Sequence, residues 1–187
     1  MKPVILDLCG GTGAWSRPYA EAGYDVRVIS LPGFDVLTYE PPEGVHGVLA
    51  APPCDHFSVS GAQYWPAKDA DGRTAHALAV VDACLRIIDG ARPAWWALEN
   101  PIGRLRKLRA LGKPTLAFDP CDFGDPYTKR TLLWGVFNPP IRRPVEPVRV
   151  CSQGSWLQTL GGKSERTKRL RSVTPPGFAR AFFDANP

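Results

Sequence analysis

VILDLCGGTG, residues 4–13, is an apolar run that leads into three glycines within four positions. The apolar part predicts a buried strand over residues 4–8, and the glycines predict a turn into a helix that reaches about Ala22. Gly23 ends this helix, and residues 25–29 (DVRVI) begin a second strand. A strand, a helix and a second strand make the βαβ unit from which parallel sheets are built.

The same alternation continues along the chain. Residues 45–51, 95–98 and 131–137 predict further strands, and the apolar spacing over residues 75–89 predicts a helix that Gly90 ends. Strands that alternate with helices indicate an α/β fold with a doubly wound, mostly parallel sheet. The remaining predictions are a short element over residues 35–37, a mobile loop over 59–70, a basic helix over 102–111 whose charges face solvent, an irregular segment over 138–170 and a final helix from Thr174.

The composition is typical of a globular protein outside membranes. The chain has 187 residues, of which 44% are hydrophobic and 22% charged, which suits one domain with a real core. No apolar stretch approaches the ~18 residues of a membrane span, and the first residues already read as a strand, so we expect no signal peptide. Five scattered cysteines without a Cys-x-x-Cys pair indicate reduced thiols, a cytoplasmic location and no metal site.

The net charge is +5, and most of the excess lies late in the chain. The basic residues concerned are Arg142, Arg143, Arg149, Lys163, Arg166, Lys168, Arg169 and Arg171. A basic segment beside an α/β domain favours a polyanionic partner, most simply nucleic acid. A solvated surface loop would carry the same charges.

Three features stand at the ends of predicted strands, where open α/β folds bind ligands. The glycine turn over residues 10–13 is typical of a nucleotide-like cofactor site, or of a tight structural turn. Cys54 follows two prolines that end a central strand, which favours a displayed thiol over a packed one. Glu99 follows the apolar residues 95–98. If its carboxyl group is desolvated there, its pKa is raised; a carboxylate at the strand end that contacts solvent would be an ordinary surface group. Together they predict an active site.

Five stretches together resemble motifs of the C5-cytosine DNA methyltransferase family. Residues 7–16 (DLCGGTGAWS) are similar to its S-adenosylmethionine loop, and residues 52–58 (PPCDHFS) to its nucleophile motif. Residues 99–101 (ENP) resemble its Glu-Asn-Val motif. Residues 127–135 (YTKRTLLWG) resemble its arginine-bearing motif, and residues 171–180 (RSVTPPGFAR) its late Arg-x-Leu-Thr-Pro motif. The motifs follow the family's order, so the resemblance is specific.

The resemblance implies a class I S-adenosylmethionine-dependent methyltransferase fold and methylation of cytosine C5 in DNA. It implies that the Cys54 thiolate attacks C6 of the base, that Glu99 holds the N3 and N4 edge, and that Arg130 orients the base or its O2. It assigns the cofactor to Asp7, Cys9, Gly10, Gly11, Thr12, Gly13, Trp15, Ser30, Asp35 and Pro52. It assigns the target base and its surroundings to Pro53, Ser58, Asn100, Lys129 and Thr174.

The chain departs from the family pattern in its cofactor loop and in its size. Cys9 stands where the family has phenylalanine, and Ser30 where an acid commonly holds the ribose. We expect a catalytic domain over residues 1–137, a short basic segment over 138–170 in place of a recognition domain, and a C-terminal helix over 171–187 that packs on the catalytic domain. Such a compact, phage-like version implies relaxed sequence preference, or a protein partner or second copy that completes recognition.

Two alternatives stay open. The same chemistry could act on a free cytosine nucleotide or on RNA, because the recognition segment is small. The chain could instead be a non-catalytic DNA-binding subunit that keeps a methyltransferase fold, because Cys9 and Ser30 replace the family's usual cofactor residues.

Overall fold

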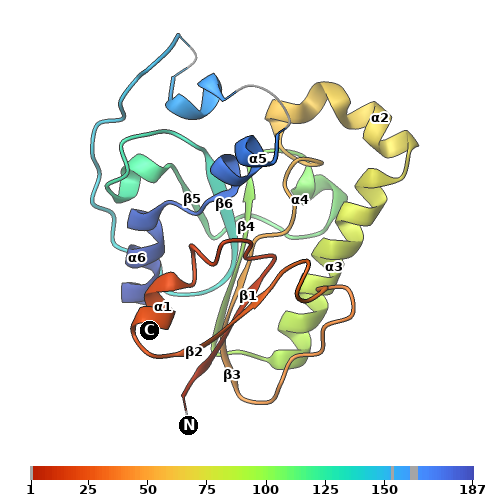
Figure 1. Ribbon diagram of the computed structural model, residues 1–187, viewed down its shortest axis with the longest axis vertical. Helices are drawn as coiled ribbons and strands as arrows, with labels where there is room; N and C mark the ends of the chain where they lie inside the picture. Colours follow the sequence, from red (N-terminus) through yellow and green to blue (C-terminus); the bar gives the residue numbers. More distant parts are fainter. Residues whose placement is uncertain (1, 153, 161–163) are drawn as a thin grey trace.

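The structure, a computed structural model, describes residues 2–152, 154–160 and 164–187. Six strands form one sheet in the order β2-β1-β3-β4-β6-β5 (Figure 1). They are β1 (Val4–Leu8), β2 (Asp25–Ile29), β3 (Val45–Ala50), β4 (Trp95–Pro101), β5 (Leu116–Phe118) and β6 (Thr131–Val136). The α/β class predicted from the sequence is confirmed.

The sheet is mixed rather than uniformly parallel. β1 pairs in parallel with β2 and β3, and β3 pairs in parallel with β4. β6 runs antiparallel to both β4 and β5. Strand direction at this edge is not encoded in apolar periodicity, and an antiparallel pair needs no crossover helix. We predicted a doubly wound, mostly parallel sheet, and the antiparallel strand β6 is the departure from that prediction.

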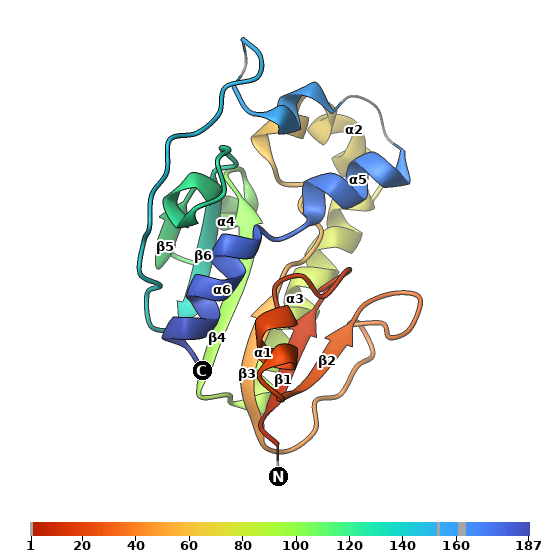
Figure 2. The same cartoon turned by 60° about the vertical axis from the view of Figure 1, so that its left-hand side comes forward.

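Helices lie on both faces of the sheet, as Figure 2 shows. The α-helices are α1 (Arg17–Glu21), α2 (Trp65–Ala70), α3 (Arg73–Ala91), α4 (Leu105–Leu108), α5 (Glu165–Ser172) and α6 (Pro176–Ala185). The 3-10 helices are η1 (Val59–Tyr64), η2 (Pro120–Phe123) and η3 (Trp156–Thr159). No helix in the described part of the chain is long and apolar enough to cross a membrane.

Side chains along β1 alternate between two cores, as the two-residue period of a strand requires. Leu6 and Leu8 belong to the core that α3 covers. Ile5 belongs to the core on the opposite face, where Phe178 and Phe182 of α6 pack. This alternation sends Asp7 to the α6 side, at the carboxyl end of the strand.

Several predicted elements differ from the structure. The expected loop over residues 59–70 contains η1 and α2. These two helices were not predicted because the segment has a polar composition without clear periodicity. The expected helix over residues 102–111 shrinks to α4, because the backbone at Gly103 pairs with Ser58 in a β-bridge instead. Residues 35–37 lie in a turn region, and η3 and most of α5 occupy the segment predicted to be irregular.

Candidate active site

The turn after β1 is built around a buried carboxyl group. Asp7 is fully buried, and the hydroxyl of Ser16 donates a hydrogen bond to its Oδ2 over 2.6 Å. Its Oδ1 has no hydrogen-bond partner within the described residues. Burial raises the pKa of Asp7 to about 6, although the Ser16 bond acts in the opposite direction. An acidic group that is buried and only half satisfied is a costly arrangement, which points to a function beyond packing.

Gly10 of this turn fits closely over Asp7. A Cβ at Gly10 would lie 2.3 Å from the Asp7 Cγ, so only glycine allows this approach. Gly11 and Gly13 have φ angles of 54° and 66°, in the left-handed region. The turn is closed by its own main chain, since the Gly13 N–H donates to the Gly10 carbonyl over 2.9 Å.

Other residues predicted to bind the cofactor have separate surroundings. Trp15 is buried in the α6 core, where its ring meets Phe178 and Phe182. Cys9 adopts a φ of 58°, and its N–H donates to the Ile29 carbonyl over 2.8 Å. Asp35 accepts a hydrogen bond from the Leu37 N–H, and the main-chain oxygen of Ser30 accepts from residues 33 and 34. Thr12 is exposed.

Cys54 sits on a loop that β4 supports. β3 ends at Ala50, and the completely buried Asn100 in β4 donates from Nδ2 to the Pro52 carbonyl over 3.2 Å. The Cys54 carbonyl accepts hydrogen bonds from the N–H groups of Phe57 and Ser58, which closes the next turn. Because β3 and β4 are parallel neighbours, their carboxyl ends bring Cys54 and Glu99 to one edge of the sheet.

Three ionisable groups act on one another at this edge. Burial, and then the negative charge of Glu99, raise the pKa of the Cys54 thiol to about 11, and the charge of Lys129 opposes them. Burial raises the pKa of Glu99 as well, and Lys129 again opposes the shift. The structure thus brings together a thiol, a carboxyl and an ammonium group, the elements of a nucleophilic site.

Lys129 and Arg130 have different surroundings although they are adjacent. The Asp119 carboxylate accepts the Lys129 N–H through Oδ1 over 2.9 Å and pairs with the Arg130 guanidinium through Oδ2 over 3.2 Å. The Arg130 side chain is 50% exposed. The cation that acts on Cys54 in this structure is therefore Lys129, which we predicted as a substrate-binding residue, while Arg130 is held by Asp119.

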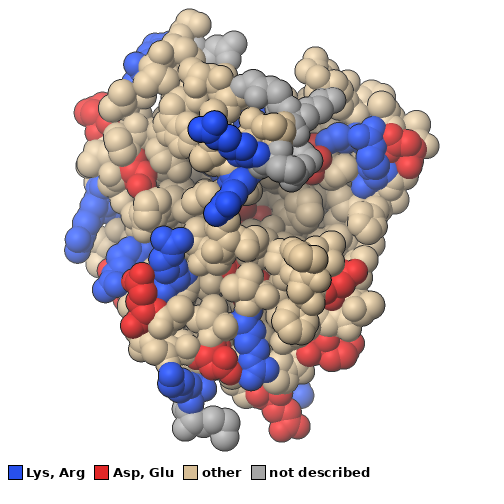
Figure 3. All heavy atoms as spheres, viewed as in Figure 1, with Lys and Arg blue, Asp and Glu red and all other residues tan. Residues whose placement is uncertain are grey.

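The remaining predicted substrate residues lie around the same loops. Ser58 caps η1 by accepting the Ser60 N–H, Pro53 is exposed, and Thr174 is half-buried just before α6. Figures 1 and 2 show α5 at the end of the molecule toward which β1 and β4 point. Arg166, Arg169 and Arg171 of α5 are exposed, and Figure 3 shows basic side chains at its position beside a hollow in the surface.

Sequence reasoning missed a second group of residues at this site. Arg104, predicted to face solvent, has a side chain that is only 13% exposed. Lys68 is also buried, and its Nζ donates to the Asp55 carbonyl over 2.6 Å. A lysine or arginine is rarely buried unless it is paired, but the local sequence gives no sign of this, because the partners lie far along the chain.

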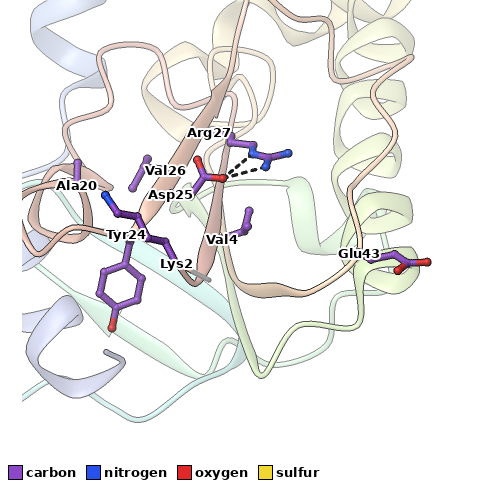
Figure 4. Close-up of a pocket in the computed structure, with 8 residues that line it drawn as sticks. All are labelled: Lys2, Val4, Ala20, Tyr24, Asp25, Val26, Arg27 and Glu43. Carbon is purple, nitrogen blue, oxygen red and sulfur yellow. Dashed lines mark hydrogen bonds and ion pairs between the residues drawn. The ribbon is translucent and has the colours of Figure 1, made fainter.

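Two other features of the molecule fall outside this site. A hollow at the amino ends of β1 and β2 is lined by Lys2, Val4, Tyr24 and Arg27, and Arg27 is paired there with Asp25 (Figure 4). This hollow contains none of the predicted site residues. Within the described ranges, no three His, Cys, Asp or Glu side chains gather as a metal ion would require.

Comparison with known proteins places the fold. A proposed DNA modification methyltransferase encoded within an E. coli prophage superposes with a TM-score of 0.51 at 17% sequence identity. The Entamoeba histolytica methyltransferase EhMeth superposes with a TM-score of 0.50 at 11% identity. The chain has a methyltransferase-like fold. No protein-family model and no curated protein matches its sequence.

The superpositions cover most of this chain but only part of the two methyltransferases. They cover 88% and 89% of this chain, against 56% of the prophage-encoded protein and 62% of the Entamoeba protein. The chain therefore spans less than two thirds of either structure.

Proposed function

We propose that this protein methylates C5 of cytosine in DNA, with Cys54 as a covalent nucleophile and S-adenosylmethionine as the methyl donor. The observation that carries the proposal is the meeting of the Cys54 thiol, the Glu99 carboxyl and the Lys129 ammonium group at one edge of the sheet. Ordinary packing does not require three such groups together in a half-buried position.

Cys54 performs the bond-making step of the proposal. The thiol first loses its proton to solvent, and the sulfur then adds to C6 of cytosine as the C5=C6 π bond breaks. The electron pair moves to C5, which would take the methyl group as its bond to the donor's sulfonium sulfur breaks, so that neutral S-adenosylhomocysteine would be the leaving group. Removal of the C5 proton by a base returns an electron pair to the ring, the C5=C6 bond re-forms, and Cys54 departs as the thiolate.

Glu99 and Lys129 adjust the charges around that step. The raised pKa of Glu99 keeps more of this carboxyl protonated near neutral pH, so that it can donate a hydrogen bond to N3 of cytosine. A protonated Glu99 no longer opposes ionisation of Cys54, and Lys129 favours the thiolate directly. Protonation of Glu99 and the charge of Lys129 thus act together to favour the thiolate.

The turn after β1 fits S-adenosylmethionine. The buried Asp7 oxygen without a described partner supplies an acceptor for a cationic amino group, and Gly10 leaves room for the Asp7 carboxyl beneath the turn. Asp7, Gly10, Gly11 and Gly13 would hold the cofactor, which supplies an activated methyl group when bound. Ser30 and Asp35 follow β2 at the same edge of the sheet and would contact its nucleoside part.

DNA is the substrate that the charge distribution favours. The chain has a net charge of +5, and α5 presents exposed arginines at the end of the molecule that carries Cys54. Arginines in such a position bind phosphates without reading sequence. A base in a duplex must leave the stack to reach Cys54, at a cost of a few kcal/mol.

One observation favours a second candidate, a DNA-binding protein that has lost catalysis. A thiol whose pKa is raised to about 11 is a weak nucleophile at neutral pH. In that case DNA and S-adenosylmethionine would bind, and no methyl transfer would follow.

A transfer assay separates these functions. Labelled S-adenosylmethionine is incubated with the protein and, in parallel, with dCMP, RNA, single-stranded DNA or duplex DNA of mixed sequence. We expect label at cytosine C5 in DNA, none with Cys54→Ala, and normal transfer with the control Cys151→Ala. Wild-type protein that binds both ligands without transferring label would support the non-catalytic candidate. Transfer by Cys54→Ala would refute the nucleophile.

A further inference from the structure

We propose that Arg104 is a positioning residue that fixes the Cys54 loop, acting through a polar clamp with Asp69, Thr74 and Trp65. The inference rests on the proposed function for its catalytic meaning, because it concerns the loop that carries the proposed nucleophile. Its structural content concerns the exposure and orientation of one thiol, which can be measured without any methyl transfer.

The main-chain carbonyls on both sides of Cys54 are held from outside the loop. The Pro52 carbonyl accepts from Asn100, and the Asp55 carbonyl accepts from Lys68 over 2.6 Å. Arg104 donates hydrogen bonds to the next two carbonyls along the chain. Its Nε donates to the His56 carbonyl over 3.0 Å, and its main-chain N–H donates to the Phe57 carbonyl over 2.9 Å. The thiol therefore lies between two fixed ends of a short segment.

The far end of the Arg104 guanidinium ties the same loop to α2 and α3. Its two terminal nitrogens each donate to one carboxylate oxygen of Asp69, both over 2.7 Å, in a planar fork. One of them also donates to the Thr74 hydroxyl over 3.0 Å, and Thr74 is buried at the start of α3. The guanidinium lies 4.6 Å from the centre of the Trp65 ring. Lysine could not make these contacts, because it has neither the fork nor the flat face.

The backbone beside Arg104 is equally constrained. Gly103 forms a β-bridge with Ser58, and a Cβ at Gly103 would lie 1.9 Å from the Phe57 carbonyl oxygen. The Val59 N–H donates to the Ile102 carbonyl over 3.1 Å. Arg104 thus follows directly after the contact between the segment around Ser58 and the segment around Gly103. From this position its side chain can reach both the Cys54 loop and α2.

The clamp acts on a thiol that is half-buried in the free protein. Asn100 of β4, Lys68 of α2 and Arg104 hold the main chain around this thiol, and burial is the first cause of its raised pKa. Loosening the clamp should expose the thiol, lower its pKa and speed its alkylation, while the same change should slow methyl transfer by misplacing the sulfur. A residue that served only overall stability would also speed alkylation of Cys84, the fully buried thiol of the core, when it is replaced.

The test measures alkylation of Cys54 by iodoacetamide between pH 7 and pH 10, by mass spectrometry of the folded protein. Arg104→Lys and Asp69→Asn are compared with Arg109→Lys, because Arg109 forms a similar fork with Asp82 on the surface of α3. We expect the two clamp variants to alkylate about tenfold faster at pH 8, as a fall of one pKa unit would give. The control should match the wild type, and thermal unfolding shows whether each variant is folded.

The outcomes separate the clamp from the proposed function. Unchanged Cys54 alkylation in both folded clamp variants, or an equal change in Arg109→Lys, would overturn the clamp even if the wild type methylates DNA. Faster alkylation in the clamp variants together with no transfer by the wild type would support the clamp and refute the function. If the clamp and the proposed function are both correct, the clamp variants should lower kcat more than they raise KM for DNA.

Discussion

Asn100 in β4 donates its amide Nδ2 to the Pro52 carbonyl over 3.2 Å, two residues before Cys54. This one bond joins the ends of two parallel strands and sets where the thiol leaves the sheet. Asn100 is fully buried, and its Oδ1 lacks a hydrogen-bond partner among the residues described. A buried amide with an unused acceptor is unusual in packing and suits a residue that also meets a substrate.

Asn100→Ala should therefore weaken both the fold and the site. Loss of the bond leaves the buried Pro52 carbonyl without its donor, which costs about 1–3 kcal/mol in the free energy of unfolding. Urea denaturation measures this cost, and the transfer assay measures the loss of activity. The matched control is Asn138→Ala, because the Asn138 amide also donates to a backbone carbonyl but is exposed. Equal effects of the two substitutions would contradict the role of Asn100.

Asp7→Asn should stabilise the protein while weakening cofactor binding. The folded protein holds the Asp7 proton up to about pH 6, against an ordinary pKa of 3.8. The free energy of unfolding therefore falls as pH rises through that window, and the asparagine variant escapes this loss. At pH 8 the free energy of unfolding of the variant should exceed that of the wild type by about 3 kcal/mol, and near pH 3 the two proteins should not differ.

Denaturation of both proteins across pH 3–8 checks the Asp7 prediction, and calorimetry checks S-adenosylmethionine binding. A stability difference that does not vary with pH would contradict the buried charge. Undiminished cofactor affinity in Asp7→Asn would contradict the proposed acceptor.

Substitutions at Glu99 and Lys129 should move the Cys54 pKa in opposite directions. Glu99→Gln removes a negative charge, so the thiol pKa should fall below about 11, and Lys129→Gln should raise it further. The pH dependence of Cys54 alkylation measures both shifts. Cys121 is the internal control, because its pKa is raised by burial first and then by the charges of Asp119, Asp122 and Glu146, and not by Glu99. A shift of the same sign in both variants would refute the electrostatic account.

Reversing charge on α5 should weaken DNA binding. The double variant Arg169→Glu, Arg171→Glu removes two phosphate contacts, so the affinity should fall and its dependence on salt should become shallower. The control reverses Lys2 and Arg92, which are exposed at the amino edge of the sheet and change the net charge equally. Fluorescence anisotropy at several salt concentrations measures both, and an equal loss in the control would indicate a general charge effect.

Five of the six strands and the long helix could be predicted from the sequence, because their residues follow simple periodicities, whereas β5, with only three residues, was missed. The two prolines before Cys54 and the apolar run before Glu99 were enough to predict both residues at strand ends. The direction of β6 could not be predicted, since strand pairing depends on contacts across the whole sheet. The burial of Arg104 was missed for the same reason: Asp69 and Thr74 lie 35 and 30 positions away.

The difference between Lys129 and Arg130 is of a similar kind. Both are cations before β6, and the resemblance to a known family favoured Arg130. Asp119 decides between them, because it binds the Arg130 guanidinium and leaves the Lys129 ammonium to act on Cys54. Asp119 lies ten positions before Lys129 and eleven before Arg130, so the local sequence gives no signal of this preference.

Covalent trapping tests the central claim most directly. Duplex DNA of mixed sequence that contains 5-fluorocytosine is incubated with the protein and S-adenosylmethionine, because fluorine at C5 cannot leave as a proton does. We predict a complex that survives denaturing electrophoresis, with the base attached to the Cys54 peptide in mass spectra and no complex with Cys54→Ala. Methyl transfer to ordinary DNA without any such adduct, or an adduct at another cysteine, would contradict the account.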